Sequence, residues 1–262
     1  MLHTILKFVT VLTFIFACQL DATNKEVIKF AAIDWCPQLC GQQKDQGYII
    51  ELIKKIYPAS EYQLQIDFFP WSRAIKVVRN GQYHALLSPA KYEAPDLHYP
   101  INPAGNQQMC FFVLAENKWR YTGVQSLAGL SIGIAADTSI EELNQYFLEN
   151  EAQFQVQPYL ERYVAQNANK LLKHRVDTFI FTRNTTVLEL SKLNLDDKIT
   201  IAGCVNAEMV FVAFSSHPDV KREISNYIAR YDAEYPSLVN SGWIQSLYDK
   251  YNISWDVSSH DK

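Results

Sequence analysis

The stretch Phe68–Tyr92, FFPWSRAIKVVRNGQYHALLSPAKY, decides the fold of this 262-residue chain. Pro70 ends a β-rich run, because proline has no N–H to donate to a neighbouring strand. From Trp71 onward, apolar residues recur at helical spacing for about two turns. The run Ala85–Leu87 is then short and apolar, as a buried parallel strand requires, and a Ser-Pro pair stops it. The stretch therefore predicts one β-α-β unit.

Two polar segments of this unit are candidates for a binding site. Open α/β sheets bind ligands at the carboxyl ends of their strands, and Ser88 and Lys91 follow the predicted strand 85–87. Trp71 and Arg73 open the predicted helix beside it. We expect these four side chains to face one crevice.

The composition excludes several classes of protein. The chain has 48% hydrophobic and 20% charged residues, a net charge of −4 and no basic block, which argues against nucleic acid as a partner. Its length is enough for one large domain or for two lobes. The sequence patterns of serine hydrolases, zinc proteases and phosphate-binding loops do not occur.

The first segment predicts export. Lys7 precedes Phe8–Ala17, ten mostly apolar residues. A membrane-spanning helix needs about twenty such residues, so the segment is typical of a cleaved signal peptide. We predict a signal peptide at 1–22 that ends at Ala22. An alternative is lipid attachment at Cys18, because Ile-Phe-Ala-Cys is similar to a bacterial lipobox, and only then would the protein be held at a membrane.

Four cysteines remain for the folded protein, namely Cys36, Cys40, Cys110 and Cys204. An even number in an exported chain favours disulfides. The first two enclose three residues and can bond if the chain turns there. The other two end apolar stretches and can bond if those stretches are neighbours. Buried free thiols are the alternative, and a metal site is disfavoured because no second Cys or His pair lies nearby.

Five segments in order resemble the extracellular solute-binding proteins of family 3. These segments are Gly47–Ile56, Phe68–Tyr92, Val124–Ile134, Arg175–Arg183 and Ser241–Tyr251. The resemblance implies the type II periplasmic-binding-protein fold, an α/β fold of two lobes. Each lobe would be a mostly parallel sheet flanked by helices, with two crossover strands as the hinge. We expect lobe 1 at 25–113 plus 210–262 and lobe 2 at 114–209.

The resemblance also implies ligand-binding residues. Trp35 matches an aromatic residue at a strand end that stacks on the ligand, and Trp71 is a second candidate for stacking. Asp137, Thr138 and Ser139 match the Gly-Thr-Thr/Ser turn that contacts the ligand in relatives. Thr138 and Ser139 are also suited to cap a helix that would start there.

Two departures from the family change the expected ligand. Relatives hold the ligand's α-carboxylate with an arginine, but Asp96 falls near that position and no arginine occurs between Arg79 and Arg120. A carboxylate would repel the anion that a guanidinium attracts. Thr182 stands where relatives carry the aspartate that pairs with the ligand's ammonium. A standard α-amino acid is therefore not the expected ligand, unless Arg73 or Lys91 replaces the missing arginine.

The leading hypothesis is a periplasmic, monomeric solute-binding protein without cofactor, metal or enzymatic activity. It would capture a small polar or partly aromatic ligand between closing lobes and present it to an ABC permease or a membrane sensor. One alternative is an orphan sensory or protein-interaction protein without a transport role. Another is a lyase similar to cyclohexadienyl dehydratase, with a general acid among Asp34, Asp96, Asp137 and Glu208.

Overall fold

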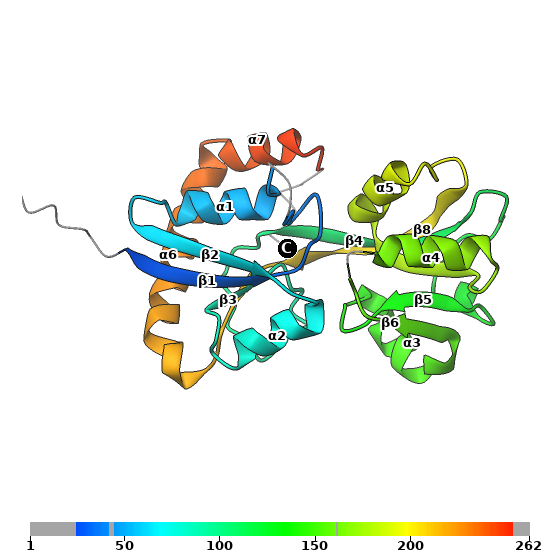
Figure 1. The fold of residues 1–262 in the computed structure, drawn as a ribbon, viewed down its shortest axis with the longest axis horizontal. Helices are drawn as coiled ribbons and strands as arrows, with labels where there is room; N and C mark the ends of the chain where they lie inside the picture. Colours follow the sequence, from blue (N-terminus) through cyan, green and yellow to red (C-terminus); the bar gives the residue numbers. More distant parts are fainter. Residues whose placement is uncertain (1–24, 42–44, 161, 254–262) are drawn as a thin grey trace, which may run out of the picture.

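The computed structural model describes residues 25–41, 45–160 and 162–253. The predicted signal peptide and the lipid site at Cys18 lie outside these residues. Figure 1 shows two bodies side by side, joined by two long strands. We call the body built on the four-stranded sheet lobe 1 and the body built on the five-stranded sheet lobe 2.

The sheet of lobe 1 has the strand order β2-β1-β3-β9. Its strands are β1 (Glu26–Ala32), β2 (Tyr62–Phe68), β3 (Ala85–Leu87) and β9 (Val212–Phe214). Strand β1 is parallel to both β2 and β3, while β9 pairs antiparallel with β3. Helix α2 (Trp71–Arg79) connects β2 to β3, which confirms the predicted β-α-β unit.

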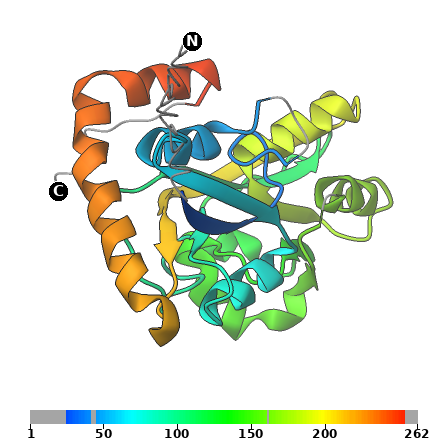
Figure 2. The same ribbon diagram turned by 60° about the vertical axis from the view of Figure 1, so that its left-hand side comes forward.

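Three further helices belong to lobe 1. They are α1 (Tyr48–Ile56), α6 (Lys221–Asn240) and α7 (Trp243–Lys250). Figure 2 shows α6 along the outer edge of the molecule, with α7 at its end. We expected α6 to end near Tyr231, but Tyr235 and Leu238 continue its buried face at helical spacing, so it runs on through Pro236.

The sheet of lobe 2 has the order β6-β5-β7-β4-β8. Its strands are β4 (Gly105–Leu114), β5 (Ile132–Ala135), β6 (Phe154–Gln157), β7 (Thr178–Thr182) and β8 (Ile199–Val210). Strand β5 is parallel to β6 and β7, whereas β4 runs antiparallel to β7 and β8. The helices are α3 (Asn144–Glu149), α4 (Tyr163–Leu172) and α5 (Arg183–Lys192).

Strands β4 and β8 are the two long strands that join the lobes (Figure 1). The residues 206–208 interrupt the apolar pattern of the sequence. In the structure, however, Ala207 and Glu208 stay paired with Gln108 and Gln107, so β8 is continuous to Val210. The positions of the lobe boundaries, at 113/114 and 209/210, remain a prediction.

Glycine at position 105 is required where β4 leaves lobe 1. A Cβ atom there would lie 2.6 Å from the Tyr48 hydroxyl oxygen, and Tyr48 is fully buried. Any side chain at this position would push the strand away from the helices of lobe 1. The glycine thus fixes where the hinge begins.

All four described cysteines are bonded. Cys36 pairs with Cys40 in the loop after β1, and Cys110 pairs with Cys204 where β4 faces β8. Among the described residues, no helix is long and apolar enough to cross a membrane.

Candidate functional site

Four chain segments meet between the lobes, each at the carboxyl end of a strand. Trp35 follows β1 and Ser88 follows β3, and these two strands are parallel. In lobe 2, Thr138 follows β5 and Thr182 ends the parallel strand β7. Carboxyl ends of parallel strands are where open α/β sheets place ligands. Both lobes therefore present their binding edges to each other.

A cavity of about 30 Å³ lies at this meeting point. One buried water takes roughly 10–15 Å³ by this measure, so the space equals about two or three waters. Aromatic side chains dominate its walls: Trp35 and Trp71 from lobe 1, and Tyr159 and Phe181 from lobe 2. The cavity is thus small and largely apolar.

Two larger grooves lie next to the cavity and share lining residues with it. One groove, of about 340 Å³, shares Glu93 and Thr138 with the cavity. The other, of about 400 Å³, shares Tyr159 and is walled by Phe68 and Phe69. A ligand larger than the cavity therefore has two directions in which to extend.

The two tryptophan side chains bind across the cleft. The Trp35 indole N–H donates to Thr182 Oγ1 at 2.9 Å, and the Trp71 indole N–H donates to the Asp137 carbonyl at 2.9 Å. The Ser72 hydroxyl also donates to the Asp137 carboxylate. Each of these indoles thus lines the cavity and donates its N–H to the opposite lobe.

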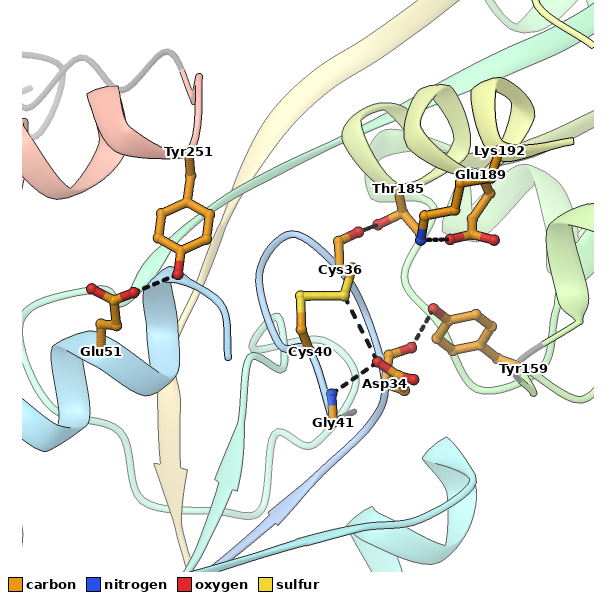
Figure 3. The surroundings of a disulfide bond; sticks show 10 residues. All are labelled: Asp34, Cys36, Cys40, Gly41, Glu51, Tyr159, Thr185, Glu189, Lys192 and Tyr251. Carbon is orange, nitrogen blue, oxygen red and sulfur yellow. Dashed lines mark hydrogen bonds and ion pairs between the residues drawn. A yellow bond between two sulfur atoms is a disulfide. The ribbon is translucent and has the colours of Figure 1, made fainter. Parts of the chain in front are cut away.

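The loop after β1 is held by lobe 2 as well (Figure 3). The Tyr159 hydroxyl donates to the Asp34 carbonyl at 2.8 Å, and the Thr185 hydroxyl donates to the Cys36 carbonyl at 2.8 Å. The bond between Cys36 and Cys40 closes this loop on itself. The loop that carries Trp35 is therefore fixed both covalently and by the other lobe.

The carboxylate of Glu93 joins the lobes. Its Oε2 accepts from the Ala90 backbone N–H in lobe 1 at 2.8 Å, and its Oε1 accepts from the Ser139 backbone N–H in lobe 2 at 2.9 Å. Burial raises the pKa of Glu93 from 4.5 to about 8, and the carboxylate of Glu208 adds to the rise. Glu208 itself accepts from the Ser139 hydroxyl at 3.0 Å. Two carboxylates thus meet at one serine of lobe 2.

Ser88 of lobe 1 and Asp137 of lobe 2 have unusual backbone conformations. Their φ angles are 69° and 57°, in the left-handed region that residues other than glycine seldom adopt. Ser88 is buried, and its Oγ has no hydrogen-bond partner among the described residues. Such strain and unpaired polar atoms concentrate at functional sites.

The structure brings together most of the residues predicted from sequence. Those that line the cavity are Trp35, Trp71, Ser88, Thr138 and Thr182. Asp137 lies in the adjacent groove. Ser139 contributes its backbone N–H to Glu93 and its hydroxyl to Glu208.

The helix predicted directly after Ser139 starts later than expected. A 3-10 turn (Glu141–Leu143) comes first, and α3 begins at Asn144. The Thr138 hydroxyl donates to the Ala135 carbonyl at 3.0 Å, within its own turn. The Asn144 side chain accepts from the Ile140 N–H at 3.0 Å. This segment is therefore a compact turn that presents Thr138 to the cavity.

Arg73 and Lys91 are not at the cavity. Both side chains are exposed, with the Arg73 guanidinium 5.5 Å from the ring centre of Phe69 and the Lys91 ammonium 4.7 Å from that of Phe211. Neither takes the place of the missing arginine in this structure.

Sequence reasoning missed Glu93, Tyr159 and Phe181. Asp96 was considered at the position of the family's arginine, but it forms an exposed ion pair with Arg79 at 2.7 Å. The available signal for Glu93 was an acidic residue in the loop just beyond a strand's carboxyl end. Tyr159 lies in the corresponding loop after β6.

A metal site has no support in the part of the chain that the structure describes, where no group of three His, Cys, Asp or Glu side chains is placed to hold an ion. The ionisable group on the cavity wall is the carboxyl of Glu93, which accepts from the backbone N–H groups of Ala90 and Ser139 and also interacts with the side chain of Trp71.

No protein-family model matches the sequence, and no curated protein matches it either. Solved structures do match. A histidine kinase sensor domain with similarity to periplasmic binding proteins has a TM-score of 0.70 at 15% identity, over 87% of this chain and 96% of that one. An ancestral arginine-binding protein bound to arginine has a TM-score of 0.67 at 14% identity, over 87% and 98%.

A third structure has a TM-score of 0.69 at 16% identity, and the match covers 87% of this chain and 95% of the chain in that structure. It was described for glutathione import in Gram-positive bacteria via GshT and the cystine ABC importer TcyBC of Streptococcus mutans. Likeness at such low identity shows the fold. The chain has the two-lobed α/β fold of type II periplasmic binding proteins, as the sequence motifs predicted.

Proposed function

We propose that this chain is an exported solute-binding protein that closes two lobes on a small ligand and presents it to an ABC permease. The observation that carries the proposal is the aromatic cavity built by both lobes at their strand ends. Aromatic walls with a few placed polar groups are typical of small-molecule sites. The two disulfides fit an oxidising compartment such as the periplasm.

The hinge supports this function. Two strands connect the lobes, which is the arrangement in which domains close around a ligand. The contacts of Trp35, Trp71 and Glu93 cross the cleft, so opening the lobes would break them together. We propose Trp35, Trp71, Ser88, Thr138 and Thr182 as ligand-binding residues and a monomer as the working form.

Tryptophan fluorescence titrations test the proposal, with a panel of amines, amino acids, organic acids and neutral aromatic compounds. A ligand should change the emission and reduce the radius of gyration in X-ray scattering. Trp35→Phe should weaken binding. Trp119→Phe is the matched control, because its indole N–H donates to the Ser126 carbonyl within lobe 2 at 2.9 Å. Equal effects of the two substitutions would contradict the proposed site.

A sensory or protein-interaction module is the second candidate. It is favoured by the number of direct bonds between the lobes, since protein groups such as Glu93 can hold the closed form themselves. A lobe geometry that stays the same with every compound, together with binding of a partner protein, would favour this candidate.

A lyase is the weaker alternative. Asp96 is unsuited as a general acid, because its hydrogen bonds from Arg79 lower the pKa of its carboxyl group. Glu93 has the raised pKa that a general acid needs, but both its oxygens are engaged by backbone amides. We therefore propose a binding role for it.

A further inference from the structure

The ionisable side chain on the cavity wall is acidic. Among the described residues that line the cavity, it is Glu93, and none is Lys, Arg or His. Of the cations elsewhere on the cleft side, Arg79 is bound to Asp96 by three hydrogen bonds of 2.7 to 3.1 Å. A positive charge placed in the cavity would therefore find a carboxyl group that can ionise, whereas a negative charge there would find no cation among the lining residues.

The donors that would hold an anion are already used. The N–H groups of Ala90 and Ser139 converge from the two lobes, but both donate to the carboxylate of Glu93. A carboxylate on the ligand would have to displace Glu93 and would also face Glu208. The chain thus supplies its own carboxylate at the point where the lobes meet.

The remaining walls suit a cation that carries N–H groups. Trp35 and Trp71 line the cavity, and the face of an indole ring attracts ammonium ions. The buried hydroxyl of Ser88 has an unused oxygen that can accept a hydrogen bond from such a group. A counter-ion (Glu93), two aromatic side chains and a hydrogen-bond acceptor (Ser88) therefore line the same cavity.

We propose that this cavity binds the ammonium end of a primary amine that lacks a carboxylate, with Glu93 as its counter-ion. The inference rests on the proposed solute-binding function and names its ligand class. The cavity of about 30 Å³ fits the ammonium end alone. An apolar body would lie in the groove of Phe68 and Phe69, which meets the cavity at Tyr159.

Binding should release a proton. Burial raises the pKa of Glu93 to about 8, so at pH 7 the carboxyl group is mostly protonated, and an ammonium ion favours its ionised form. The other charged or titratable groups around it are Glu208, Tyr99, Asp137 and the Arg79–Asp96 pair. Burial and nearby carboxylates raise the pKa of Tyr99, which therefore stays neutral in this range.

Calorimetry with phenethylamine on the purified full chain tests the inference. The matched comparisons are 2-phenylethanol, phenylalanine and 3-phenylpropionate, which change the charge and keep the ring. We expect the amine to bind at least tenfold more tightly than the alcohol and the two carboxylates. In two buffers of different ionisation enthalpy, the heats at pH 7 should reveal close to one released proton per amine.

Glu93→Gln should weaken amine binding at least tenfold and abolish the proton release. Asp96→Asn is the control, since this carboxylate is three residues away, exposed and outside the cavity. Wild-type affinity should also rise between pH 6 and 9, a result that does not depend on how the variant folds. Preferred binding of a carboxylate compound or the alcohol would overturn the amine inference and leave the binding function standing. No binding by any class of compound would overturn both.

Discussion

Aromatic side chains gather in two regions of this molecule, and their polar atoms have different partners. At the outer side of lobe 1, the hydroxyl of Tyr57 donates to the Tyr227 carbonyl at 2.8 Å. Those of Tyr231 and Tyr248 donate to carbonyls of residues 103 and 104, just before β4. We call these residues with Tyr48 the tyrosine cluster. Every one of these bonds stays within lobe 1.

In the cleft, by contrast, the polar atoms of aromatic side chains form hydrogen bonds to the other lobe. The indoles of Trp35 and Trp71 and the phenol of Tyr159 each donate to the other lobe. Their bonds exist only while the lobes are closed. A buried aromatic ring therefore stabilises the fold where its polar atom has a hydrogen-bond partner in the same lobe. It stabilises the closed state where that partner is on the other lobe.

Removal of a ring from the tyrosine cluster should give the largest loss of stability. Tyr57→Ala would leave a cavity between α1 and α6 and should lower the free energy of unfolding by about 3–5 kcal/mol, measured by urea denaturation. Ligand affinity of the folded fraction should be unchanged. A large loss of affinity without a loss of stability would contradict the assignment of the tyrosine cluster to folding and of the cleft residues to closure.

The buried carboxyl of the cleft should make stability depend on pH. The unfolded chain releases the Glu93 proton near pH 4.5, whereas the folded protein keeps it to about pH 8. The stability that this proton contributes is complete below pH 4.5 and is lost as the pH rises towards 8. We expect the loss across this pH range, relative to Glu93→Gln, to be roughly 3–5 kcal/mol. Parallel stability curves for the two proteins would contradict the buried carboxyl.

Loss of one indole N–H should act on closure more than on folding. Trp35→Phe removes the bond to Thr182 and keeps most of the apolar surface. We expect affinity to fall about tenfold, or roughly 1.4 kcal/mol, with a smaller change in the free energy of unfolding. Scattering should find more of the open form. Unchanged scattering and affinity would mean that this bond does not hold the lobes.

The smallest effect is expected at the surface. Asp96→Asn breaks the ion pair with Arg79, in which both side chains are about half exposed. Exposed pairs contribute at most about 1 kcal/mol, and salt weakens them. Binding should be unaffected. A marked loss of binding would place the loop 93–96 as a whole in the site, and not Glu93 alone.

The sequence was sufficient where the signal is local. Helical spacing after Trp71, the proline at 70 and the short apolar run 85–87 predicted the β-α-β unit, because each follows from a few neighbouring residues. The strand-end rule predicted Ser88 as a site residue, and the family resemblance predicted Trp35 and Thr182; all three line the cavity. The same rule also predicted Lys91, which does not line the cavity.

It was insufficient where the role of a residue depends on distant partners. Glu93 acts through the backbone amides of Ala90 and Ser139, and no side-chain pattern encodes where amides meet. The continuity of β8 past Asn206 likewise depends on pairing with β4, which stabilises polar residues that look like a break in the sequence.

The disulfide between Cys110 and Cys204 gives lobe 2 a closed contour. Its two cysteines are 94 positions apart in sequence yet lie opposite each other on the strands that enter and leave the lobe. A single protease nick anywhere in 111–203 would leave both fragments covalently attached. The strands that lead into and out of lobe 2 are therefore joined covalently to each other, whatever happens to the chain between them.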